Sequence, residues 1–535
     1  MRLKKAIHLA ILVGIVGALI VGGCTSSSSS NAPKELKIAT RSFEEDTVIP
    51  WKARQGVGRD TLANMYDSLI SLGSDGKAAP GLATKWEMSP DGSSWTFNLR
   101  QGVKFHDGSD LTTDDVQFSW DKYWANDKVT TDYATIKRYV TKYEMVDKYT
   151  IKVYTKMNNV ALPDLMIDNS MFMMIMPKAY FEKNGEEYFA QHPIGSGPWV
   201  FVDHKAANYF KFKKAPSEQF KNSYRPEPKF DLLTILEVPD DNARVSMLKT
   251  GEVDVATLSV KQAGDVKGDA NLNALTASMI QLSYRIIDAS GAEERKMPTG
   301  NAKVREAMAL AVDKQSIVKD FTAGYGQVSL GMEPAFPFYG EAIVKAAGQA
   351  MPYDPAKAKQ LLAEAGYPQG FEVTLYAFPM PGAPFAPDLA QIVAGYWEAI
   401  GIKTKLEIGD SASMRPLYAK PTPDKARGQV YMWRNPPWMY PPAQWDSYWS
   451  KGGVYELWSS PKTDELFKAA YQETDPKKRD QLMAEIAATV SKLNISVPLL
   501  YVPDLMVKGP KVKDFTTLVG KYGMSDQIVK MEPAK

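Results

Sequence analysis

Residues 354–408, DPAKAKQLLAEAGYPQGFEVTLYAFPMPGAPFAPDLAQIVAGYWEAIGIKTKLEI, show the clearest folding pattern in this chain. Asp354 can cap a helix, Pro355 suits its first turn, and Gly366 can end it after apolar residues spaced three and four apart. The elements expected after this helix are a strand over 371–376, an amphipathic helix over 387–400 and a strand over 402–408. A strand, a helix and a strand in this order predict a parallel pair in an α/β domain.

Other parts of the chain repeat this alternation of extended and helical patterns. Residues 36–40 and 96–100 alternate apolar and polar side chains, as a strand with one buried face does. Thr112, with Asp115 three residues later, predicts a capped helix start, so the pair Asp114 and Asp115 has a structural use. The fold class predicted for the chain is therefore α/β.

The N-terminal residues predict export. A basic start is followed by an apolar run over 6–23, by Cys24 and by serines at 26–30. A membrane-spanning helix needs about 20 apolar residues and seldom exits into polyserine, so a signal peptide followed by a flexible tether is favoured. The sequence before Cys24 resembles a bacterial lipobox, which implies that this cysteine is lipidated. The alternative is an ordinary signal peptide cleaved nearby, with Cys24 incidental.

The composition excludes several classes of function. Cys24 is the single cysteine, so no disulfide can form within one molecule. The net charge is +2, and −1 once residues 1–23 are removed, which gives no electrostatic basis for binding nucleic acid. The remaining histidines are His106, His192 and His204, without metal-ligand spacing, so neither a metal nor a cofactor is expected.

A set of ordered motifs identifies a family resemblance. The motifs are 65–70 (MYDSLI), 80–87 (PGLATKWE), 91–100 (DGSSWTFNLR), 102–108 (GVKFHDG), 111–116 (LTTDDV), 193–199 (PIGSGPW), 248–254 (LKTGEVD) and 304–314 (VREAMALAVDK). With them, the chain after residue 35 resembles the family 5 extracellular solute-binding proteins, which serve peptide, nickel and oligosaccharide ABC importers. Glycines and Asp-Gly pairs in these motifs are interpreted as turn residues rather than ligand contacts.

The resemblance implies a two-lobed, type II periplasmic-binding-protein-like fold with a hinge and an extra domain inserted in the first lobe. The implied boundaries are 1–23 for the signal peptide, 24–33 for the lipidated cysteine and tether, 34–75, 195–283 and 503–535 for the first lobe, 76–194 for the inserted domain, and 284–502 for the second lobe. Such proteins are monomers outside the membrane that close around a small solute and deliver it to permease subunits. No catalytic role is expected.

The two peptide-end anchors of this family are missing from the expected positions. By resemblance, peptide binders hold the free amino group with an aspartate three residues after a tryptophan, and here Trp433 is followed by Pro436. The arginine that holds the carboxylate in dipeptide binders is replaced by Met380, in a loop without any cation. A dipeptide specialist is therefore disfavoured, although Arg434 or the region of Asp446 could substitute.

Aromatic side chains are concentrated between residues 431 and 458, and most are expected in the core. The predicted ligand-binding residues are Phe43, Glu44, Met380, Trp433, Arg434, Trp438 and Tyr440. Their aromatic rings suit either a peptide or an oligosaccharide, and both ligands stay open at this stage. A surface solute sensor without a transport role also stays open, whereas a glycoside hydrolase built on Glu44 or Glu45 lacks any supporting constellation.

Overall fold

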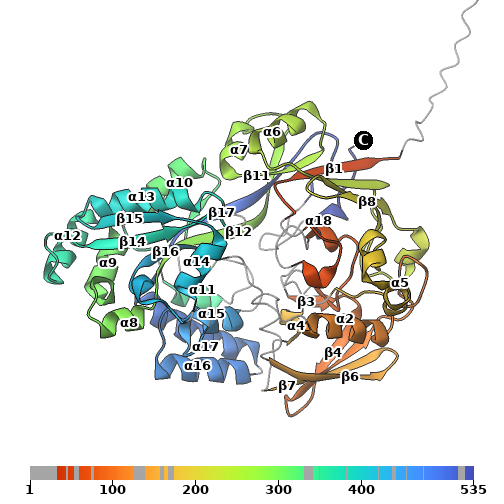
Figure 1. The fold of residues 1–535 in the computed structure, drawn as a ribbon, viewed down its shortest axis with the longest axis horizontal. Helices are drawn as coiled ribbons and strands as arrows, with labels where there is room; N and C mark the ends of the chain where they lie inside the picture. Colours follow the sequence, from red (N-terminus) through yellow and green to blue (C-terminus); the bar gives the residue numbers. More distant parts are fainter. Residues whose placement is uncertain are drawn as a thin grey trace, which may run out of the picture. The chain divides into compact units, whose positions relative to one another are not determined.

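A computed structural model describes residues 33–43, 46–53, 60–73, 77–125, 139–156, 162–166, 174–329, 341–348, 350–380, 383–419, 421–435, 441–453, 455–473, 475–515 and 525–534. Residues from Lys34 onward form one structural unit by their contacts. Among the described residues, this unit is built on a large mixed sheet with helices packed on it (Figure 1).

The large sheet has eleven strands among the described residues. Its order is β15 (Lys403–Ile408), β14 (Glu372–Ala377), β16 (Val430–Asn435), β12 (Asn273–Ile286), β17 (Ser496–Lys508), β11 (Val255–Leu258), β1 (Glu35–Thr40), β10 (Leu232–Glu237), β9 (Tyr209–Lys214) and β8 (Trp199–Lys205), with β13 (Gln327–Val328) beside β17. The strands β1, β10 and β11 pair in parallel, whereas β8, β9 and β10 form an antiparallel meander.

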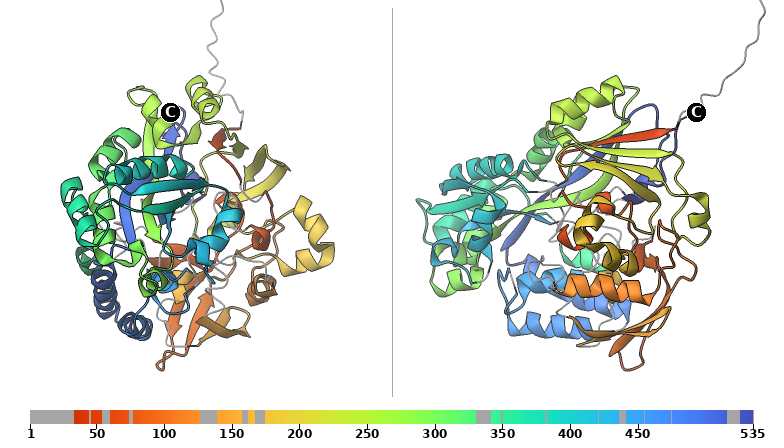
Figure 2. Two further views of the ribbon diagram at one scale, coloured as in Figure 1. Left: turned by 60° about the vertical axis from the view of Figure 1, so that its left-hand side comes forward. Right: turned by 45° about the vertical axis from the view of Figure 1, so that its right-hand side comes forward.

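Two long strands, β12 and β17, connect the two halves of this sheet. They pair antiparallel from Asn273↔Lys508 to Arg285↔Ser496, and Figures 1 and 2 show them side by side. The register shifts at two places, between Thr276 and Ser278 and between Leu282 and Ser283. Such irregularities bend a strand and increase its twist. The lobe boundaries expected after residues 283 and 502 both fall inside this strand pair.

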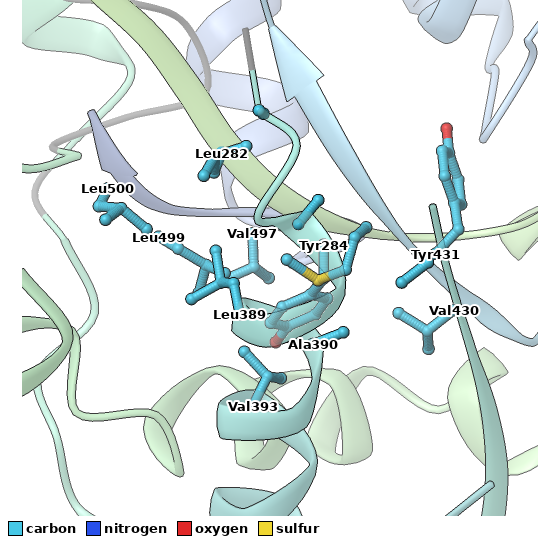
Figure 3. Packing of buried hydrophobic residues seen from close by; sticks show 14 of the residues in the cluster. Leu282, Tyr284, Leu389, Ala390, Val393, Val430, Tyr431, Val497, Leu499 and Leu500 are labelled. Atoms are coloured by element: carbon cyan, nitrogen blue, oxygen red, sulfur yellow. The ribbon is translucent and has the colours of Figure 1, made fainter. Parts of the chain in front are cut away.

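The α/β prediction is confirmed in the half of the sheet that contains residues 354–408. Strands β14 and β15 are parallel, with α12 (Pro355–Glu364) before them and α13 (Ala386–Glu398) between them. The Asp354 carboxylate accepts a hydrogen bond from the Lys357 amide at 2.9 Å, and Gly366 has φ +90°. Figure 3 shows Leu389, Ala390 and Val393 of α13 packed beside Tyr284 of β12. The helix therefore buries its apolar face on the sheet, as its spacing predicted.

A smaller antiparallel sheet occupies part of the segment expected as an inserted domain. Its order is β4 (Ala83–Met88), β5 (Ser94–Leu99), β7 (Thr150–Thr155) and β6 (Val140–Asp147), with α2 (Thr113–Ala125) and α5 (Lys178–Gln191) nearby and a separate pair of β2 (Ile70–Leu72) and β3 (Ala78–Pro80). The predicted cap of α2 is present, since the Thr112 amide donates to the Asp115 carboxylate at 2.9 Å. Phe97 and Ile151 share one hydrophobic cluster with Leu36 and Leu233. This sheet therefore shares its core with β1 and β10.

A second hydrophobic cluster covers the rest of the large sheet. Tyr139 belongs to this second cluster, whereas the next residue, Val140, belongs to the first. The other helices are α4 (Leu162–Leu165), α6 (Asp241–Thr250), α7 (Val260–Asp265), α8 (Ala289–Glu294), α9 (Ala302–Leu310), α10 (Lys314–Phe321), α11 (Glu341–Ala346), α14 (Ser411–Tyr418), α15 (Pro441–Trp449), α16 (Pro461–Gln472), α17 (Pro476–Ser491) and α18 (Ser525–Ile528). The chain thus passes between two cores just before β6.

Candidate ligand-binding site

The pairing of β12 with β16 gives these two strands one polar, aromatic face. The cross-strand pairs on that face are Gln281↔Asn435, Ser283↔Trp433 and Arg285↔Tyr431, named here the β12–β16 stripe. Residues directly opposite in an antiparallel pair share a face, and every second residue along a strand does too. The intervening Tyr284 and Val430 point toward α13 in Figure 3, whereas Tyr431 points away from it. The stripe is therefore the face of β12 and β16 that turns away from α13.

A hydrogen-bond chain fixes the polar side chains of the stripe. Arg285 donates through Nη2 to Asn435 Oδ1 at 2.6 Å and through Nε to Ser496 Oγ at 3.2 Å. The Asn435 amide donates to Gln281 Oε1 at 2.7 Å, and Gln281 donates to Ser329 Oγ at 2.8 Å. All five side chains are buried. Because each is held by a neighbour, the Arg285 guanidinium has a set position.

Aromatic rings surround that guanidinium and Trp433. The Arg285 carbon Cζ lies 4.0 Å from the Tyr448 ring centroid and 5.6 Å from that of Trp433. The Trp433 ring in turn lies 5.3 Å from Tyr418, 5.6 Å from Tyr431 and 5.9 Å from Tyr455. Burial raises the pKa of both Tyr418 and Tyr431, so their phenols stay neutral. The rings around Trp433 therefore form an uncharged aromatic wall, and the Arg285 guanidinium packs against the Tyr448 ring in a cation–π contact.

Three uncharged side chains of the stripe carry a polar atom that has no hydrogen-bond partner within the described part of the chain. They are Ser283 Oγ and the Tyr431 hydroxyl, both on fully buried residues, and the Nε1 atom of Trp433, whose ring is only partly covered. Most buried polar groups in proteins are paired, and leaving one unpaired costs about 1–3 kcal/mol. Ser283 and Trp433 are directly opposed, and Tyr431 lies opposite Arg285 on the same face. Their position marks the place where the stripe has hydrogen-bonding capacity to offer a ligand.

The structure places the predicted site residues in different surroundings. Trp433 lies at the centre of the aromatic wall, whereas Arg434, the next residue along β16, lies on the opposite face of the strand. Met380 is buried in a tight turn, with its carbonyl accepting from the Ala383 amide at 2.8 Å. Phe43 is fully buried, edge-on to Phe210 at 4.8 Å. Cys24, Glu44, Trp438, Tyr440 and Pro436 lie outside the described residues.

Sequence reasoning missed Gln281, Ser283 and Arg285. The signal was present, because these three residues alternate with Leu282 and Tyr284 as a strand with two unlike faces does. The expectation that most aromatic residues of 431–458 fill the core is confirmed. The buried ones are Tyr431, Trp445, Tyr448, Trp449 and Tyr455.

Other candidate groups have structural uses. His106 accepts from the Gly195 amide at 3.2 Å and its Nε2 lies 2.9 Å from Gly197 O, and burial lowers its pKa to about 4. Asp46 contacts His204 and accepts from the Ala207 amide at 2.6 Å.

Within the described ranges, no group of three or more His, Cys, Asp or Glu side chains is placed to hold a metal ion. In the same residues, no helix has the length and apolar character that crossing a bilayer requires.

The long strand pair within one mixed sheet, with a second small sheet nearby, agrees with solved structures of two-lobed type II periplasmic binding proteins. The peptide-bound DppA of Helicobacter pylori superposes with a TM-score of 0.74 at 21% identity, over 94% of this chain and 99% of that one. HbpA2 of Haemophilus parasuis superposes with a TM-score of 0.76 at 23% identity, over 94% of this chain and 100% of that one. The fold is therefore that of a two-lobed solute-binding protein.

Sequence comparison identifies the family. Residues 77–456 match the model for the bacterial extracellular solute-binding proteins, family 5, middle region. The glutathione-binding protein GsiB of Salmonella paratyphi A is 29% identical over 506 residues, which cover 91% of this chain and 92% of that protein. The chain belongs to the family 5 extracellular solute-binding proteins, as its motifs predicted, and it is a substrate-binding protein of the ABC-transporter type.

Proposed function

We propose that this protein captures a small, peptide-type solute outside the cytoplasmic membrane and delivers it to the permease subunits of an ABC importer. The observation that carries the proposal is the family match over residues 77–456, and the unpartnered polar atoms of Ser283 and Trp433 in the β12–β16 stripe support it. The solute would lie between a first lobe of residues 34–75, 195–283 and 503–535 and a second lobe of residues 284–502. Closure of the lobes would signal occupancy to the permease.

The N-terminal sequence supports a lipid anchor for this receptor. The basic start, the apolar run over 6–23 and the serines at 26–30 flank Cys24 as a lipoprotein leader and tether would. A protein held at the outer face by one lipidated cysteine stays near its permease, and its tether leaves the lobes free to close. Radiolabelled fatty acid should be incorporated into the native protein and not into Cys24→Ser; equal labelling of the two would exclude this anchor.

The site and the relatives both bear on the class of the ligand. GsiB is named for glutathione, and the DppA structure contains the peptide STSA, so a peptide-type solute is the leading candidate. An oligosaccharide is the second candidate, because Trp433, Tyr418 and Tyr455 offer flat rings that stack on sugar rings. A surface sensor would use the same site without a permease.

A binding screen tests the proposal directly. Protein that has been unfolded, dialysed and refolded is heated with glutathione, with short peptides or with neutral oligosaccharides. A ligand present at one hundred times its Kd adds about 2.7 kcal/mol to the stability of the folded state, so its melting temperature rises visibly. The proposal fails if no small solute stabilises the protein. Loss of solute import on deletion of an ABC permease, with solute binding by the protein unchanged, would separate transport from sensing.

A further inference from the structure

We propose that the β12–β16 stripe binds a carboxylate of the solute, so the ligands of this protein are organic acids. This inference rests on the proposed function and adds the chemical class of the group held at this site. It follows from the kind of hydrogen-bonding atoms that the stripe presents.

The stripe presents hydrogen-bond donors around Ser283 and Trp433, where polar atoms have no partner within the described residues. Trp433 Nε1 is a donor only, the Arg285 guanidinium is a donor only, and the Ser283 hydroxyl can donate. Trp433 Nε1 and Ser283 Oγ have no partner within the described residues. A carboxylate oxygen accepts from all three kinds of group, and its charge is opposite to that of the guanidinium.

The two side-chain amide oxygens of the stripe already accept hydrogen bonds from its own side chains. Asn435 Oδ1 accepts from Arg285, and Gln281 Oε1 accepts from Asn435. Helix α15, whose Tyr448 packs on Arg285, carries the buried Asp446 carboxylate, which accepts from the hydroxyls of Tyr471 and Ser450. A ligand ammonium at the stripe would be repelled by the fixed Arg285 guanidinium, and the acceptors left to it on the stripe are uncharged oxygens. The site therefore has the opposite polarity to one that holds a peptide amino group.

Burial makes this discrimination strong. Ser283 and Arg285 are 0% and 1% exposed, so a ligand group that reaches them loses its water. A charged group in such a place binds only where its hydrogen bonds and its counter-charge are replaced. A neutral amide or ester offers one carbonyl acceptor and no charge, so it accepts fewer hydrogen bonds from the stripe and does not neutralise Arg285. The aromatic wall of Tyr418, Tyr448 and Tyr455 would cover the apolar part of the same ligand.

The test compares acids with their uncharged derivatives. Calorimetry measures the Kd of Ser-Thr-Ser-Ala and of its C-terminal amide, and of glutathione and its diethyl ester. We expect the acid of at least one pair to bind ten times or more tighter than its derivative. In Ser283→Ala, and in Trp433→Phe, which keeps an aromatic ring, the Kd of the acid should rise several-fold more than the Kd of its derivative. Equal affinity for acid and derivative would overturn the inference.

A matched control lies next to Ser283 on the same strand. Tyr284 is fully buried, its hydroxyl also has no partner within the described residues, and it lies on the face toward α13. Tyr284→Phe should leave the ratio of acid to derivative affinity unchanged. If Tyr284→Phe changes that ratio as much as Ser283→Ala does, the effect is one of general packing and the stripe is not the carboxylate site.

Native mass spectrometry of protein purified from its source separates failure of the inference from failure of the function. A co-purifying ligand that carries a carboxylate supports the inference, and a tightly bound neutral oligosaccharide overturns it while solute binding stands. If no ligand co-purifies and no member of the panel binds, the proposed function fails as well.

Discussion

The link between Tyr139 and α16 is open to a quantitative test. The Tyr139 hydroxyl donates to the Tyr471 hydroxyl at 2.6 Å, and that hydroxyl donates to Asp446 Oδ2 at 3.1 Å. Tyr139 immediately precedes β6, whereas Tyr471 lies on α16 in the segment expected as the second lobe. The two rings are 5.4 Å apart, and all three residues are buried. The link therefore connects the two sides of the expected cleft.

The expected magnitude follows from the groups left behind by each substitution. Tyr139→Phe removes one buried hydrogen bond, which costs about 1 kcal/mol. Tyr471→Phe removes two and deprives the Asp446 carboxylate of a donor, so about 2 kcal/mol is expected. If the link forms when the lobes close, these losses oppose closure. The Kd of a bound solute should then rise about fivefold in Tyr139→Phe and about thirtyfold in Tyr471→Phe.

Calorimetric titration with any solute found in the binding screen measures these Kd values. Tyr143→Phe is the matched control, because the Tyr143 hydroxyl contacts Asp121 within the smaller sheet and its helix and does not cross to α16. The Kd of this control should stay within twofold of the parent. An unchanged Kd in both Tyr139→Phe and Tyr471→Phe, with folding intact, would show that the link does not contribute to closure.

Three further substitutions test the fold and the site. Gly197→Ala should destabilise the protein by 2 kcal/mol or more, since the added carbon would lie 2.6 Å from the Met65 carbonyl carbon; thermal unfolding checks this, and an unchanged melting temperature contradicts it. Burial lowers the pKa of His106 from 6.5 to about 4. Between these pH values the unfolded chain binds more protons than the folded protein does, so the folded protein loses stability as the pH falls. About 2 kcal/mol should be lost between pH 7 and pH 5, and urea unfolding of His106→Gln should lack that part of the loss. Trp433→Ala should weaken solute binding by about 1–3 kcal/mol in a titration, and an unaltered Kd would mean that the site lies elsewhere.

Local signals explain which parts of the fold were predictable. The helix after Asp354 and the strands on either side of α13 were predicted to within about two residues, because caps, glycines and apolar spacing all lie within each element. The resemblance supplied the two-lobed architecture, which no local pattern contains. Trp433 was predicted as a site residue from the motif position it occupies and stays a prediction, whereas its aromatic neighbours Tyr418 and Tyr455 were not predicted.

The polar residues of the candidate site could not be predicted from the sequence, because they are brought together by strand pairing between distant segments. Ser283 and Arg285 acquire their neighbours only when β12 pairs with β16, and nothing local to either strand specifies that register. Glu44, Trp438 and Tyr440 lie outside the described residues, so these three stay predictions.

The core itself determines which residues form the stripe. Tyr284 must face α13, because its ring packs edge-on to Trp397 at 5.0 Å and is fully buried there. Side chains alternate along a strand, so this packing sends Ser283 and Arg285 to the other face. A slip of one residue would place Arg285 against the apolar face of α13 and Tyr284 in the stripe. Burying the unpaired guanidinium charge there would strongly destabilise the folded protein. The packing of α13 on one face of β12 therefore fixes the donors that the opposite face offers to a ligand.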